Sequence, residues 1–162
     1  QGVRCKEYHY YFSHGRKASP WQAPFQWCSL EALDLESMQE AAKLFQGQHW
    51  FGHYAVQAQE ETILEREMLS AGIFPAPRHA LGFPMEDAWV FKVRAKGFLR
   101  NQVRLMMGAL IEVGLGQKRV EDIALSLEPH QGPKQKRIAP GSGLVLHEVL
   151  VGEKKLNQGE II

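Results

Sequence analysis

One stretch decides the fold class of this 162-residue chain: residues 89–114 read WVFKVRAKGFLRNQVRLMMGALIEVG. Over residues 89–96 apolar and cationic side chains alternate, which predicts a β-strand with one buried face. After Gly97 the apolar spacing changes to three and four residues, which predicts a helix over residues 98–114. A strand that runs directly into a helix is therefore expected at the centre of the fold.

The solvent-facing side of the expected strand carries positive charge only, from Lys92, Arg94 and Lys96. Like charges at this spacing repel one another and are not buried without partners, so the face must meet water, carboxylates or phosphate. A solvated edge balanced by acids of another strand, such as Glu65 and Glu67, explains the pattern. A phosphate track explains it equally well, and the charge pattern alone leaves both interpretations open.

Further strands and helices are expected on both sides of this centre. They are strands over residues 7–15, 61–69 and 144–151, helices within residues 33–47 and 120–129, and a loop with three prolines over residues 72–84. Asp34 is the expected N-cap of the first helix. Because strands and helices do not alternate as βαβ units, we expect an α+β domain with a mainly antiparallel sheet and helices on one face.

The composition is typical of a globular domain, with 44% hydrophobic and 23% charged residues. No apolar run approaches the roughly 20 residues that cross a bilayer, so no membrane partner is expected. Cys5 and Cys28 are expected to be reduced thiols of an intracellular protein, with cytosol, nucleus and mitochondrion left open. The formal net charge is +1, so a nucleic-acid surface would depend on charge placement. Since the first residue is Gln1, we expect a piece of a longer chain.

The sequence contains one pair of residues with metal-ligand spacing, His49 and His53. The stretch around them is not convincingly helical, and no third ligand is evident. We therefore expect no metal site there.

Four blocks of sequence, taken together, resemble a known family. FLRNQVRLMMG (residues 98–108) resembles the family pattern F-L-x-x-x-V-R-x-(I/M)-(V/M)-G, and APGSGLVL (139–146) resembles A-P-x-x-G-L-x-L. KEYHYYF (6–12) and LESMQEAAKLFQGQHWFGHY (35–54) are weaker matches in the right order. The family is that of the TruA-type tRNA pseudouridine synthases. The blocks span nearly the whole chain, so residues 1–162 are expected to be one domain, the C-terminal half of the catalytic domain.

The resemblance implies roles for three residues. Tyr8 matches an active-site tyrosine that stacks on the target base, and Arg104 matches an arginine that holds the catalytic aspartate by an ion pair. Leu144 matches an apolar residue that lines the uracil pocket. The chemistry fits, because a flipped-out uracil needs an aromatic face and an aspartate nucleophile at a dry site needs a bidentate cation. Without the resemblance, Tyr8 and Leu144 would be interpreted as packing residues and Arg104 as an exposed helix residue.

The chain also departs from the family pattern. The family's nucleophile lies in an R-x-D-x-G-V motif that is absent here, and Asp34, Asp87 and Asp122 are the only aspartates. Each stands in another context, so the chain alone is expected to be inert. Trp50 replaces the acidic residue of the family's H-D-F, and Leu64 stands where an arginine is usual, which leaves a degenerate member possible.

The function that the resemblance implies is isomerisation of uridine to pseudouridine in structured RNA without metal or cofactor. The expected partners are tRNA, with ribosomal RNA as the alternative, and the missing N-terminal half of the protein; a homodimer is left open. The expected RNA-binding residues are Lys92, Arg94, Lys96, Arg100, Lys134, Lys136 and Arg137. Two alternatives remain: a catalytically degenerate RNA-binding or ribosome assembly factor, and an α+β domain whose basic face binds an acidic protein.

Overall fold

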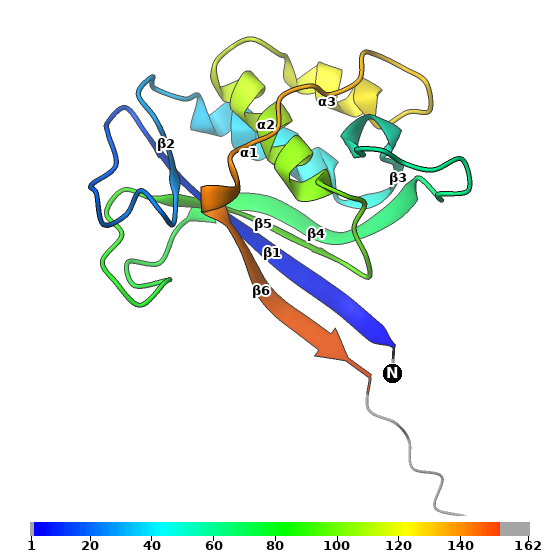
Figure 1. Ribbon diagram of the computed structural model, residues 1–162. Coiled ribbons are helices and arrows are strands. Elements are labelled where there is room, and N and C mark those ends of the chain that lie inside the picture. Colours follow the sequence, from blue (N-terminus) through cyan, green and yellow to red (C-terminus); the bar gives the residue numbers. More distant parts are fainter. Residues whose placement is uncertain (1, 153–162) are drawn as a thin grey trace, which may run out of the picture.

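The computed structural model describes residues 2–152, in which a six-stranded sheet carries helices on one face (Figure 1). The elements in chain order are β1 (Val3–His14), β2 (Trp27–Ser29), α1 (Leu35–Leu44), β3 (Gly47–Trp50), η1 (Gly52–Tyr54), β4 (Glu65–Pro75), β5 (Trp89–Ala95), α2 (Gln102–Gly114), α3 (Val120–Ser126), η2 (Gly141–Gly143) and β6 (Leu144–Val151). The strand order is β2-β1-β5-β4-β3, and β6 pairs with β1. This confirms the predicted α+β class. The sheet is mixed, because the short β2 runs parallel to β1 while the other pairings are antiparallel.

The alternation along β1 and β5 gives the sheet two different faces. Tyr10 and Phe91 are register partners, and both are completely buried in the core beneath the helices. Burial of a large side chain of this kind stabilises the fold by roughly 1.5–3 kcal/mol. Glu7 and Arg94 are also register partners and are only partly buried, on the opposite face.

Helix α2 is buried on most of its surface, because it lies between the sheet and the segment of residues 134–140. Met106 and Met107 are both completely buried. Gly108 allows the covering segment to approach closely, since a Cβ at this position would lie 2.0 Å from the main-chain oxygen of Arg137. The apolar spacing of the sequence therefore predicts the helix correctly, and the tight cover explains why nearly every side of it is apolar.

Strand β4 is longer than its sequence suggests. It begins at Glu65, so the strand predicted for residues 61–64 is wrong, and it runs to Pro75, so the loop predicted from residue 72 is wrong for residues 72–75. Ile73 pairs with Phe91, and Pro75 pairs with Trp89. Pairing with a central strand outweighs the local proline signal, and Pro75 lies at the strand end, where a missing N–H is tolerated.

Helix α2 begins at Gln102, four residues later than the sequence predicts. Asn101 precedes it with a left-handed backbone, φ 60°, which separates the preceding turn from the helix. The helix predicted over residues 98–114 therefore starts too early, and Arg100 and Arg104 do not share one side of a helix. Arg100 lies before the helix, and its Nη1 donates a hydrogen bond to Gln57 Oε1 (2.9 Å).

The face of the sheet opposite the helices is covered in part by the segment between β4 and β5. Tyr11 and Val90 form a second apolar cluster there with Met85 and Ala88. Figure 1 shows the N-terminal part of β1 and most of β6 extending beyond the helical layer. None of the helices within residues 2–152 combines the length and apolarity needed to cross a membrane.

Gly108→Ala should lower the free energy of unfolding by about 1–3 kcal/mol, because the new Cβ meets a main-chain carbonyl that cannot move without shifting residues 137–139. Thermal or urea unfolding of the variant measures the loss. Gly97→Ala is the matched control, since a Cβ at that position meets nothing within 4 Å. Equal stability of the two variants would contradict the packing described for α2.

Candidate active site

A cavity of about 190 Å³ lies where β1, β6 and the start of α2 meet. Tyr8 lines it from β1, Arg104 from the first turn of α2, and Leu144 from the first residue of β6. The structure thus brings together the three residues to which the resemblance gives roles. The other lining residues are Phe98, Leu99, Asn101, Gln102 and Val103.

The ring of Tyr8 has a fixed neighbour at the cavity. The Phe98 ring meets it edge-on, with centroids 5.2 Å apart and planes at 87°. Such edge-to-face contacts stabilise a defined ring orientation. Tyr8 is only partly buried, so the ring belongs to the wall of the cavity as well as to the core.

Arg104 is held by the segment that leads into β6. Its Nε donates to the Ala139 carbonyl (2.8 Å), and the Ala139 N–H donates to the Arg104 carbonyl (3.0 Å). Within residues 2–152, no carboxylate oxygen lies within 4.0 Å of this guanidinium. The side chain is therefore positioned by one bond, which uses neither of its terminal nitrogens.

The aspartates of the chain lie elsewhere. Asp34 caps α1 by accepting from the Ser37 N–H (3.1 Å). The other two face arginines, Asp87 with Arg16 at 3.5 Å and Asp122 with Arg119 at 3.0 Å. None of the three lines the cavity. A carboxylate facing Arg104 would have to come from outside the described residues.

Comparison with known proteins identifies the family of the chain. A family model described as tRNA pseudouridine synthase matches residues 41–150. The chain belongs to this family. Proteins named tRNA pseudouridine synthase A from Syntrophotalea carbinolica and Shouchella clausii are 32% and 30% identical to it. The matches cover 95% and 94% of this chain but only 58% and 55% of those proteins, so the chain spans about half the length of the curated relatives it matches.

Gln102 is a cavity residue of this synthase-family chain that the sequence does not single out. Its side chain is 1% exposed, and its Oε1 accepts a hydrogen bond from the Leu99 N–H (2.8 Å). Its Nε2 is buried without a hydrogen-bond partner among the described residues. A buried donor left unpaired costs about 1–3 kcal/mol. The sequence does not indicate a buried, unpaired amide at this position, because glutamines in the first turn of a helix usually face solvent.

The cationic face of β5 lies on the side of the sheet opposite to the cavity. Arg94 forms ion pairs with Glu7 (2.5 Å) and Glu148 (3.1 Å). Carboxylates of neighbouring strands thus balance the charge of Arg94, as in the first of the two interpretations of this face. Glu65 and Glu67, however, are not the partners. The Nζ of Lys92 lies 5.7 Å from the centroid of the Phe74 ring.

The remaining expected RNA-binding residues lie in three places. Lys96 is exposed at the end of β5. Arg100 is exposed just before α2, next to the cavity residues Leu99 and Asn101. Lys134 and Lys136 are exposed and Arg137 is half-buried, all on the segment that covers α2. The structure therefore separates the expected set between two faces of the sheet.

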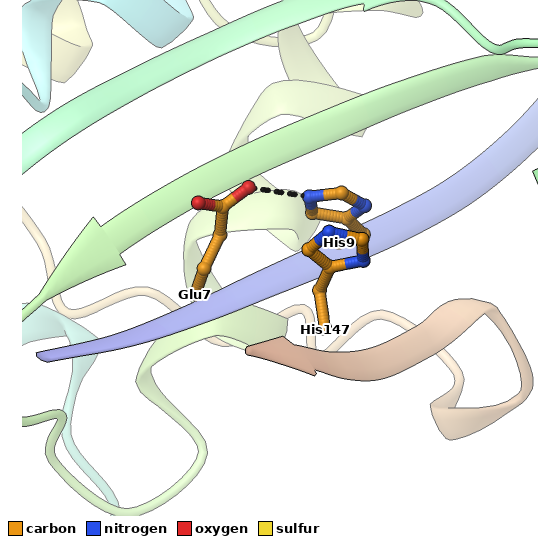
Figure 2. A group of neighbouring side chains, drawn as sticks. All are labelled: Glu7, His9 and His147. Carbon is orange, nitrogen blue, oxygen red and sulfur yellow. Dashed lines mark hydrogen bonds and ion pairs between the residues drawn. The ribbon is translucent and has the colours of Figure 1, made fainter. Parts of the chain in front are cut away.

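Figure 2 shows a second group of polar side chains, on the face opposite to the cavity: Glu7, His9 and His147. His9 Nε2 lies 2.6 Å from Glu7 Oε1, and His9 Nδ1 lies 3.2 Å from the Tyr11 hydroxyl. The His9 and His147 rings stack in parallel, with centroids 3.8 Å apart. His9 is almost fully buried, and each of its ring nitrogens has a hydrogen-bond partner. Its ring packs against β6 through the stack on His147.

The same three residues are the described side chains that could approach a metal ion, since their donor atoms lie within 4.8 Å of one another. Two features oppose it. Glu7 already faces Arg94, and Lys92 lies beside His9. The lone pairs of parallel stacked rings lie in separate planes, so one ion cannot meet both in this arrangement. The group is better described as a hydrogen-bonded network.

Burial lowers the pKa of His9 below its ordinary value, and the positive charges of His147 and Lys92 act in the same direction, against the hydrogen bond that His9 donates to Glu7. Burial of the Glu7 carboxyl raises its pKa, but hydrogen bonds with His9 and Arg94 outweigh this and leave the pKa lowered. At a pH between its folded and unfolded pKa values, each group therefore binds fewer protons in the folded state than in the unfolded chain.

The contribution of His9 to the free energy of unfolding should consequently be fully present about one pH unit above 6.5 and should fall as the pH drops through that value, because unfolded His9 then takes up a proton. Urea unfolding between pH 5 and 8 measures this slope. His9→Gln should remove most of it between pH 5.5 and 6.5, whereas His79→Gln, at an exposed position, should preserve it. An unchanged slope in His9→Gln would show that another group causes the pH dependence.

Proposed function

We propose that the complete protein converts uridine to pseudouridine in tRNA and that this chain supplies one wall of the active site. The observation that carries the proposal is that Tyr8, Arg104 and Leu144 line one cavity in a chain of this family. In the reaction the N1–C1′ bond breaks, the uracil turns, and a C5–C1′ bond forms. The C5 proton leaves and N1 gains a proton, so the product is an isomer of the substrate.

Tyr8 and Leu144 would hold the flipped base. The partly buried Tyr8 ring offers an aromatic surface in the cavity, and its edge contact with Phe98 fixes its direction. Leu144 adds an apolar wall from the other strand. Stacking on an aromatic ring contributes about 1–3 kcal/mol for each base, which offsets part of the cost of taking the base out of the RNA.

Arg104 would pair with the nucleophilic aspartate. Its terminal nitrogens can donate two parallel hydrogen bonds to one carboxylate, which lowers the pKa of that carboxyl and keeps it ionised. The aspartate would come from the part of the protein outside this chain, in the R-x-D-x-G-V motif typical of the family. This assignment agrees with the positions of Asp34, Asp87 and Asp122, none of which lines the cavity.

The open edge of β6 is the place where we expect the missing half to dock. Within the described residues β6 pairs with β1 alone, and four of its apolar side chains are 40–53% exposed: Leu146, Val149, Leu150 and Val151. An unpaired edge with apolar side chains is a template for another strand. A strand added here would extend the sheet next to Leu144 and the cavity. A homodimer would then have to use a different surface.

The RNA would approach from the side of the helices. Arg100, Lys134 and Lys136 are exposed there, whereas Arg94 is held by two carboxylates on the opposite face. We therefore assign phosphate contacts to Arg100, Lys134, Lys136 and Arg137, and not to the cationic face of β5. Contacts of this type weaken as the salt concentration rises.

Arg104→Ala in the complete protein should abolish tritium release from tRNA labelled at uracil C5, since the nucleophile loses its cation. The free energy of unfolding should fall by only about 0.5–1.5 kcal/mol, for the lost hydrogen bond to Ala139. Arg119→Ala, an exposed arginine that pairs with Asp122, is the control and should retain activity. Wild-type turnover in Arg104→Ala would exclude the role given to this residue. Tight RNA binding by a wild type that releases no tritium would favour the non-catalytic RNA-binding alternative.

The double variant Lys134→Ala/Lys136→Ala should weaken tRNA binding and reduce the slope of log Kd against log salt by about one for each lost phosphate contact. Lys96→Ala tests the opposite face and should leave the slope unchanged. Titrations at several salt concentrations measure both. A larger effect of Lys96→Ala than of the double variant would place the RNA on the β5 face.

A further inference from the structure

We propose that Gln102 reads the target base, by donating a hydrogen bond from its buried Nε2 to the O4 carbonyl of uracil. The inference rests on the proposed function, because it names a residue that selects the substrate of that reaction. It starts from two observations: Gln102 lines the cavity with Tyr8, Arg104 and Leu144, and its Nε2 has no hydrogen-bond partner among the described residues.

The free end of the Gln102 side chain must be the NH₂ group. Its oxygen accepts from the Leu99 N–H at 2.8 Å, and the Gln102 N–H donates in turn to the Leu99 carbonyl at 3.1 Å. Rotating the amide by half a turn would set the NH₂ against the Leu99 N–H, so that two donors faced each other. The side chain is thus fixed in the orientation that leaves a donor unpaired.

The surroundings of the cavity favour a partner that enters from it. Gln102 follows Asn101, whose left-handed backbone turns the chain into α2 at the cavity wall. Leu99 and Val103 are apolar and offer no side-chain acceptor, and Arg104 is itself a donor. Nε2 itself is closed to solvent, so a carbonyl oxygen carried into the cavity on an aromatic ring would satisfy it once a neighbouring side chain of the cavity shifts.

The chemistry of pyrimidines gives this contact a selective role. Uracil has an acceptor at C4, whereas cytosine has an amino group there, which would face the Nε2 donor without a hydrogen bond. A site built around one hydrogen bond rejects the analogue that cannot form it, because the buried group then stays unpaired. Gln102 would therefore exclude cytidine from the cavity.

The contact also suits the turning of the base. Rotation about the N3–C6 axis exchanges N1 with C5 and, at the same time, O2 with O4. A single donor that holds O4 before the turn meets O2 after it. Gln102 could therefore hold an acceptor in both orientations without moving.

The experiment uses the complete protein and two RNAs, the tRNA with uridine at the position that the wild type modifies and the same tRNA with cytidine there. We expect the wild type to bind the uridine RNA about tenfold more tightly than the cytidine RNA. Gln102→Glu preserves the acceptor for the Leu99 N–H and has no donor when ionised, and Gln102→Met removes both donor and acceptor. Both variants should bind the two RNAs almost equally and release tritium about tenfold more slowly in single turnovers.

Control measurements separate the outcomes. The salt dependence of binding should be unchanged in both variants, because phosphate contacts are not altered, and Gln117→Met, at an exposed position outside the cavity, should behave as the wild type. Folded Gln102 variants that still prefer uridine by the wild-type factor would overturn the inference and leave the proposed function standing. A wild type that releases no tritium from any tRNA would overturn both.

Discussion

The paired hydrogen bonds between Arg104 and Ala139 join the two parts of the chain that form the cavity. One bond comes from the side chain and the other from the main chain, so the start of α2 and the segment before β6 are fixed to each other. The same segment is tied to β1, because the Tyr10 hydroxyl donates to the Pro140 carbonyl at 2.6 Å. Tyr8, Arg104 and Leu144 come from positions far apart in the sequence, and these few bonds bring them to one place.

The sheet separates two kinds of polar chemistry. On the helical side a guanidinium and a buried amide donor lie beside aromatic and apolar side chains, which suits a planar base. On the other side Arg94 pairs with Glu7 and Glu148, and His9 bonds to Glu7 and stacks against His147. Alternation along β1 produces this division, since Tyr8 and Glu7 are neighbours in sequence and point to opposite faces.

Much of the fold could be predicted because its elements carry strong local patterns. Strand β5, the buried part of α2 and the capped α1 follow from alternation, helical spacing and Asp34. The extension of β4 to Pro75 could not be predicted, because it depends on pairing with β5 rather than on its own residues. For the site, family motifs pointed to Tyr8, Arg104 and Leu144. The unpaired amide of Gln102 and the partners of Arg94 depend on distances between segments, which composition and spacing do not contain.

The open edge of β6 has a consequence for the behaviour of the chain in isolation. Its main-chain groups and its four exposed apolar side chains offer the same surface to any extended segment, including the same strand of another molecule. As long as nothing covers this edge, the polypeptide should be prone to self-association through added strands at high concentration. A segment that pairs with this edge would therefore increase solubility during expression, whether or not it contributes to catalysis.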